Sequence, residues 1–174
     1  LGEIDSLIAE RANDPYFHEL RGQMLFENGR VREAVDSYRR AAELLPDAPL
    51  IRIGLAQAMI ETGDQASLAD AAGHLDAAVR LDREDAKAWR LLSIVHGRTG
   101  KTVLSTLASA EHALLVGRYA DAVGFAKRAG QQLAYGSPGR LRAEDIERAA
   151  KDALKKAEKE KKKKCPKRTH FPRP

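Results

Sequence analysis

One pattern of about 34 residues constrains the fold of this chain more than any other feature of its sequence. It first spans residues 15–48, where a proline opens a helical stretch and Gly29 follows its last apolar residues. A glycine at such a place ends a helix in a left-handed conformation without a steric penalty. Ala34, Tyr38 and Ala41 then recur at spacings of four and three, which mark one face of a second helix. The pattern predicts a hairpin of two antiparallel helices, which approach closely at Gly22.

The same pattern returns twice along the chain. The second copy starts at Pro49, thirty-four residues after Pro15, and the third copy starts at Ala86. Small and large residues in this order, a glycine at the turn and a closing proline are typical of the tetratricopeptide repeat (TPR). One hairpin cannot bury its own apolar face, so we expect the copies to stack into an all-α, right-handed α-solenoid whose first helices line a concave surface.

The repeats and their flanks divide the chain into seven expected stretches. Residues 1–13 are expected to end a preceding helical repeat, and because the chain begins inside this helix without a Met, we expect a piece of a longer protein. TPR 1 spans 15–48, TPR 2 spans 49–85 and TPR 3 spans 86–117. TPR 2 contains three extra residues, which we expect at its turn, within 64–69. A degenerate TPR 4 at 102–135 shares the helix 102–116 with TPR 3. A capping helix is expected at 137–155, and a basic, disordered tail at 156–174.

Charge is distributed unevenly along the chain. Residues 151–174 contain eleven Lys and Arg but three acidic residues, whereas residues 1–150 contain nineteen and twenty-two. The tail could therefore contact nucleic acid or an anionic lipid surface. We favour a solubilising terminus, because no aromatic or base-reading pattern accompanies the charge. The single cysteine excludes an internal disulfide, no apolar run is long enough to span a membrane, and no signal peptide is visible.

Nothing in the sequence predicts catalysis or metal binding in this segment. His18-Glu19 begins like the zinc-protease motif HExxH, but residue 22 is Gly where the second histidine would have to stand. We expect His18 to pack at the large-residue position of the first repeat instead. The other histidines show no ligand spacing with each other or with Cys165, and no Ser–His–Asp set or Gly-rich phosphate loop is present. We therefore expect no catalytic residue, no metal and no cofactor here.

The concave surface is the candidate functional site. A mixture of apolar, amide and cationic side chains along a groove suits an extended or helical peptide. The alternative is that these side chains pack on a neighbouring helix or domain of the same chain. The clamp by which chaperone-binding TPRs hold a terminal carboxylate needs Lys and Asn where Glu19 and Gln23 stand, so that ligand is not expected. Trp89, beside the small Ser93, is expected to be buried, with Arg90 facing the concave side. The predicted partner-binding residues are Tyr16, Glu19, Gln23, Phe26, Ile53, Gln57, Lys87, Arg90, Ile94 and Arg98, and the same register also points to Leu50 and Ile60.

Four runs of sequence together resemble one family. They are DPYFHELRGQMLFENGR (14–30), PDAPLIR (46–52), ASAEHALLVGRYADAVGFAKRA (108–129) and GSPGRLRAEDI (136–146). The runs are similar to the C-terminal TPR region of bacterial zinc metallopeptidases of the CAAX-prenyl-protease-like family, over roughly residues 1–155.

This resemblance implies a non-catalytic interaction domain from a periplasmic or membrane-associated zinc metalloprotease. The zinc and the HExxH helix would belong to the parent's catalytic domain, and no catalytic residue transfers to this chain. The implied partners are protein or peptide segments, among them the parent's protease domain and outer-membrane assembly proteins. A free-standing TPR adaptor of envelope assembly or secretion is the alternative, and nucleic-acid binding through the basic tail is a weaker one.

Overall fold

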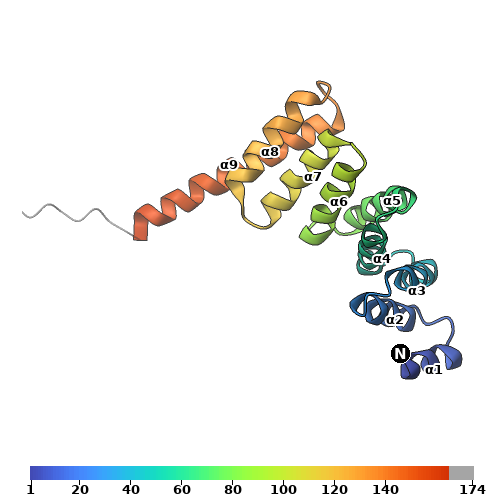
Figure 1. Ribbon diagram of the computed structural model, residues 1–174. Helices are drawn as coiled ribbons and strands as arrows, with labels where there is room; N and C mark the ends of the chain where they lie inside the picture. Colours follow the sequence, from blue (N-terminus) through green and yellow to red (C-terminus); the bar gives the residue numbers. More distant parts are fainter. Residues whose placement is uncertain (165–174) are drawn as a thin grey trace, which may run out of the picture.

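The computed structural model describes residues 1–164, which form nine α-helices and no strand (Figure 1). Residues 165–174 lie outside the described residues. The prediction of a disordered tail over 156–174 falls partly on them, and that part also lies outside the described residues. The helices are α1 (Gly2–Glu10), α2 (Pro15–Glu27), α3 (Val31–Leu44), α4 (Pro49–Thr62), α5 (Gln65–Leu81), α6 (Ala86–Arg98), α7 (Thr102–Leu115), α8 (Tyr119–Gln132) and α9 (Pro138–Lys164).

Consecutive helices pack against one another from α1 to α9, and the row of hairpins is an all-α solenoid (Figure 1). Helices α2–α3, α4–α5 and α6–α7 form three helical hairpins. The first helices also touch one another, α2 with α4 and α4 with α6, so these three helices form one row. Helix α7 packs on both α6 and α8, so it joins two hairpins.

The turn inside each hairpin depends on a glycine. Gly29 and Gly63 have φ of 73° and 76°, a left-handed conformation that a residue with a Cβ rarely adopts. The three extra residues of the second copy do not lengthen this turn, as the sequence suggested. Helix α5 begins at Gln65, directly after Asp64, whose side chain accepts hydrogen bonds from the backbone N–H groups of Ala66 and Ser67. The cap lets the extra residues add about one helical turn to α5.

One hydrogen bond recurs at the start of each hairpin. A large side chain on the first helix reaches back to a backbone carbonyl six residues earlier, two residues after the preceding helix has ended. The bonds join His18 Nε2 and the Ala12 carbonyl at 2.8 Å, Arg52 Nε and the Pro46 carbonyl at 2.6 Å, and Trp89 Nε1 and the Arg83 carbonyl at 2.9 Å. The bond fixes the loop between two repeats to the helix that follows it.

Trp89 is therefore not buried between helices, as its position in the repeat suggested. It is half-buried, with one side packed on the core and its indole N–H directed at the loop. A tryptophan N–H needs an acceptor, and the Arg83 carbonyl supplies one at the surface.

The apolar core is divided at helix α7. One cluster extends from α2 to Ala108 on α7, with Leu25, Leu55 and Leu75 fully buried. The second cluster joins α7, α8 and α9 around Ile146, and its other buried members are all alanines. The small side chains allow these three helices to approach closely, but they bury less apolar surface.

An ion pair attaches the capping helix α9 to the solenoid. The guanidinium of Arg142 on α9 donates two hydrogen bonds to the carboxylate of Glu111 on α7, at 2.5 and 2.7 Å. Glu111 is only 2% exposed, and its side chain raises the pKa of Arg142 further above its ordinary value through these bonds. The sequence pattern does not predict this pair, whose members lie 31 residues apart.

The capping helix is longer than predicted. It continues to Lys164 and projects beyond the end of α8 (Figure 1). The sequence predicts instead that the helix ends at residue 155 and that disorder begins at residue 156. Ala, Glu and Lys dominate the extra residues, and all three favour a helix even where no apolar face is present. Pairs such as Lys151 with Glu147, at 2.5 Å, support the same helix from its surface.

No helix within residues 1–164 is both long enough and apolar enough to cross a membrane.

Candidate functional site

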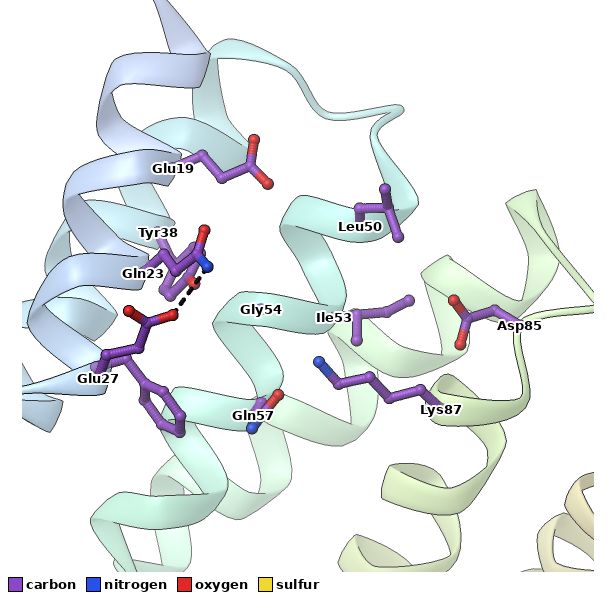
Figure 2. A pocket seen from close by; sticks show the side chains of 11 residues that line it. Glu19, Gln23, Glu27, Tyr38, Leu50, Ile53, Gly54, Gln57, Asp85 and Lys87 are labelled. Carbon is purple, nitrogen blue, oxygen red and sulfur yellow. Dashed lines mark hydrogen bonds between the residues drawn. The ribbon is translucent and has the colours of Figure 1, made fainter. Parts of the chain in front are cut away.

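A groove of about 400 Å³ lies along the first helices of the three hairpins (Figure 2). We call it the α2–α4–α6 groove. One side chain from α3, that of Tyr38, forms its floor. Its walls come from α2, α4 and the start of α6. Its lining residues are Glu19, Gln23, Phe26, Glu27, Tyr38, Leu50, Ile53, Gly54, Gln57, Asp85 and Lys87.

Two glycines allow Tyr38 to reach the groove from the second helix of its hairpin. A Cβ added to Gly54 would lie 2.7 Å from Tyr38 Cε1, and one added to Gly22 would lie 2.9 Å from Tyr38 Cδ2. Both distances are too short for a real Cβ, so the ring occupies the space that two side chains would otherwise take. Tyr38 is only 8% exposed and forms the floor of the groove between α2 and α4.

The α2 end of the groove is acidic. Burial raises the pKa of Glu19 above its ordinary value. Burial also raises the pKa of Tyr38 to about 12, and the charges of Glu19 and Glu27 add to that shift. The Gln23 amide donates a hydrogen bond of 2.9 Å to the Glu27 carboxylate, beside the Tyr38 side chain (Figure 2). Among the described residues, neither glutamate forms an ion pair.

The α6 end of the groove carries one cation and a cap. Asp85 accepts a hydrogen bond of 2.7 Å from the backbone N–H of Ala88, which fixes the start of α6. Lys87 points from α6 toward Ile53 and Gln57 (Figure 2). Leu50, 67% exposed, stands at the rim on α4. A ligand would therefore meet two glutamates at one end, the Lys87 ammonium beside the Asp85 carboxylate at the other, and apolar side chains between them.

Six of the ten predicted partner-binding residues line this groove: Glu19, Gln23, Phe26, Ile53, Gln57 and Lys87. The other four lie elsewhere. Tyr16 lines a separate hollow with residues 10–15, and Arg90 is exposed outside the groove. Ile94 is half-buried against the core. Arg98 donates a hydrogen bond of 3.0 Å to the carbonyl of Ile60, near the end of α4.

Two of the three isoleucines of α4, Ile53 and Ile60, are less exposed than their expected concave positions suggest. Ile53 and Ile60 are each 2% exposed, because α4 is covered by α2, α3, α5 and α6. Ile53 still contributes to the groove wall, whereas Ile60 does not line the groove.

Four residues that line the groove are not predicted by the register of the repeat: Glu27, Tyr38, Gly54 and Asp85. The sequence pattern places Tyr38 only on the packing face of the second helix. Gly54 was the available signal, since a glycine inside an apolar helix often marks a close approach by another group. Asp85, directly before the third copy, carries the signal of an N-cap.

The groove offers groups for binding. Its side chains are carboxylates, amides, an ammonium and hydrocarbon. His18 is hydrogen-bonded to the Ala12 carbonyl, whereas Glu19 next to it lines the groove. The two residues that begin like HExxH therefore lie in different surroundings. Within residues 1–164 no three His, Cys, Asp or Glu side chains are grouped so that they could hold a metal ion.

Comparisons with known proteins agree with this fold. Residues 25–94 match the family model of the tetratricopeptide repeat, so this part of the chain carries TPRs. A crystal structure of a protein named MamA is similar, with a TM-score of 0.62 and 16% identity over 90% of this chain and 87% of that one. A second MamA crystal structure has a TM-score of 0.61 and 18% identity over 97% of this chain and 85% of that one. At such identities the likeness concerns the fold. No curated protein matches the sequence.

Proposed function

We propose that this chain is a non-catalytic interaction module that binds a peptide segment of a partner protein in the α2–α4–α6 groove. The observation that carries this proposal is the composition of the groove. The groove has a volume of about 400 Å³, and its lining combines the apolar Phe26, Leu50 and Ile53 with two amides and with charged groups at each end. An extended or helical peptide presents the same alternation of hydrocarbon, amides and charge.

The repeat architecture supports the proposal in a second way. Stacked hairpins hold the first helices in a fixed row, so the groove exists before a ligand arrives. A preformed site loses less conformational entropy on binding than a flexible one. The amides of Gln23 and Gln57 can each donate to and accept from a peptide backbone.

A selection experiment tests the proposal. The full chain is used to select from a displayed library of random peptides about twelve residues long, ~40 Å when extended. Gln57→Trp places an indole in the groove and should abolish capture of the enriched peptides. Gln65→Trp puts the same side chain on the exposed start of α5 and should leave capture unchanged. Peptides captured equally by all three proteins would contradict the proposal.

We further propose, on the sequence resemblance alone, that the module belongs to a bacterial zinc metalloprotease and works in the periplasm or at a membrane. It would there contact the parent's own protease domain, its substrates or outer-membrane assembly proteins. The sequence of the complete gene tests this directly, because an upstream HExxH helix should be present. A gene without it would favour the free-standing adaptor of envelope assembly or secretion.

The weaker alternative is nucleic-acid binding through the Lys-rich end of the chain. Helix α9 continues through this region as far as Lys164, so its lysines are presented on a helix. Binding of duplex DNA that weakens steeply with salt and is lost on deletion of residues 156–174 would favour this alternative.

A further inference from the structure

The acidic residues of helix α2 differ from those of helix α3, against which α2 packs. All three acidic residues of α3 pair with an arginine of the same chain segment: Glu33 with Arg30, Asp36 with Arg39 and Glu43 with Arg40. Glu19 and Glu27, the two acidic residues of α2, have no cation within hydrogen-bonding or ion-pair distance among the described residues. Both line the groove. A ligand in the groove can therefore reach two carboxylates that have no cation of the chain beside them.

The hydroxyl of Tyr38 is a second, independent feature of the same place. Tyr38 is more than nine-tenths buried and lines the groove, yet among the described residues its hydroxyl makes no hydrogen bond within the protein. The hydroxyl oxygen itself is not enclosed, so a ligand in the groove can reach it as a hydrogen-bond partner. Its pKa of about 12 keeps the hydroxyl protonated at physiological pH, so it can donate one hydrogen bond and its oxygen can accept another.

A cation can donate hydrogen bonds to the acceptor atoms of all three side chains. An ammonium or guanidinium carries donors only, and the two carboxylates and the phenol oxygen are acceptors. A carboxylate brought to the same place would meet two like charges, one of them on a half-buried glutamate whose pKa is already raised by burial. The hydrocarbon stem of a Lys or Arg side chain can lie along apolar surface while its head group reaches a polar one.

We propose that the groove recognises a segment of another protein through a Lys or Arg side chain placed between Glu19 and Glu27, with its head group at the Tyr38 hydroxyl. The inference rests on the proposed function and adds the chemistry of the ligand. Lys87 at the opposite end of the groove then favours a carbonyl or carboxylate of the same segment. The two ends together orient the bound peptide.

The selection described above also tests this inference when a charge variant is added. Peptides enriched by the wild-type chain should carry Lys or Arg at one shared position. Glu19→Gln combined with Glu27→Gln keeps the side-chain shape and one acceptor oxygen at each position but removes both charges. The double variant should bind a selected peptide at least about tenfold more weakly. The control Glu3→Gln with Glu61→Gln removes two exposed, unpaired carboxylates outside the groove and should leave the affinity unchanged.

A double-mutant cycle identifies the contact itself. Replacing the shared Lys or Arg of the peptide by Gln should weaken binding to the wild-type chain, and it should have little further effect on the Glu19→Gln, Glu27→Gln chain. Independent, fully additive losses would overturn the inference.

The remaining outcomes separate the two proposals. Peptides that are blocked by Gln57→Trp but are neutral or acidic, and bind the charge variant normally, would overturn cation recognition and leave the proposed function standing. Peptides indifferent to Gln57→Trp would overturn both. The wild-type chain could also self-associate, and the charge variant could lose that self-association. This result would show that the groove binds the Lys-rich segment of a second copy of the chain, and it would overturn recognition of another protein.

Discussion

The indole Nε1 of Trp89 donates a hydrogen bond of 2.9 Å to the carbonyl of Arg83. Arg52 makes the equivalent bond to Pro46 in the preceding hairpin, and His18 makes it with Ala12 in the first one. Three chemically different side chains therefore perform one task at one position of the repeat. What the position requires is length and a ring or guanidinium nitrogen, rather than an aromatic side chain buried in the core.

Replacing Trp89 by Phe should lower the free energy of unfolding by about 1 kcal/mol, because the aromatic packing stays and one hydrogen bond is lost. Trp89→Ala should cost roughly 2–3 kcal/mol, less than the ~3–5 kcal/mol of a fully buried tryptophan, because Trp89 is half-buried. Urea unfolding followed by circular dichroism measures both changes without using tryptophan fluorescence. A Phe variant as stable as wild type would show that the bond contributes nothing.

Replacing Gly54 by Ala should destabilise the chain by about 1–2 kcal/mol, because the new Cβ would lie 2.7 Å from the buried ring of Tyr38. Gly73→Ala is the matched control in an exposed part of α5, where a Cβ meets nothing within 4 Å. The control should be stabilising by roughly 0.5–1 kcal/mol, since Ala favours a helix more than Gly does. Urea midpoints that move in the same direction for both variants would contradict this explanation of Gly54.

Replacing Glu111 by Gln should cost about 2 kcal/mol, because the charge that faces Arg142 is removed from a site that is 2% exposed. The loss should act locally, and hydrogen exchange should become faster in α9 and remain unchanged in α2–α5. Asp121→Asn provides the comparison, since the pair of Arg118 and Asp121 is more than half exposed on both sides. That change should cost under about 0.5 kcal/mol. If the two variants lost the same free energy of unfolding, the buried pair would have no special role in stability.

The stability of the chain should fall as the pH drops below about 6.5. Burial lowers the pKa of His96, the charge of Lys101 adds to this effect, and Asp76 opposes it. Burial and Arg52 lower the pKa of His74 in the same way. The unfolded chain then binds more protons than the folded chain just below pH 6.5, so acid favours unfolding until the folded histidines are protonated too.

Urea unfolding at a series of pH values between about 8 and 5 measures this loss. His96→Leu should reduce the slope, because the buried Nδ1 atom of His96 has no hydrogen-bond partner among the described residues and its protonation is costly. An unchanged slope in this variant would assign the pH dependence to other groups.

The helices of the solenoid could be predicted from the sequence because their signals are local and repeated. Pro15 and Pro49 open equivalent helices, and Gly29 and Gly63 end them at equivalent places. The end of α9 could not be predicted from apolar spacing, because residues beyond 155 form a helix through intrinsic propensity alone.

The groove was predictable where the register of the repeat decides which way a side chain faces. Glu19, Gln23 and Gln57 lie in it as the register indicated. Tyr38 and Arg98 show the limit of this reasoning. Tyr38 reaches the groove only because two glycines on other helices make room, and Arg98 turns back to the Ile60 carbonyl. Both outcomes depend on contacts between residues far apart in the sequence.

Hydrogen–deuterium exchange of the full chain, measured with and without a saturating selected peptide, shows whether partner segments bind in the α2–α4–α6 groove. If the α2–α4–α6 groove is the binding site, exchange should slow in α2, in α4 and at the start of α6, and stay the same in α8 and α9. Protection confined to α8 and α9, or no protection in α2 and α4, would contradict the assignment of the groove.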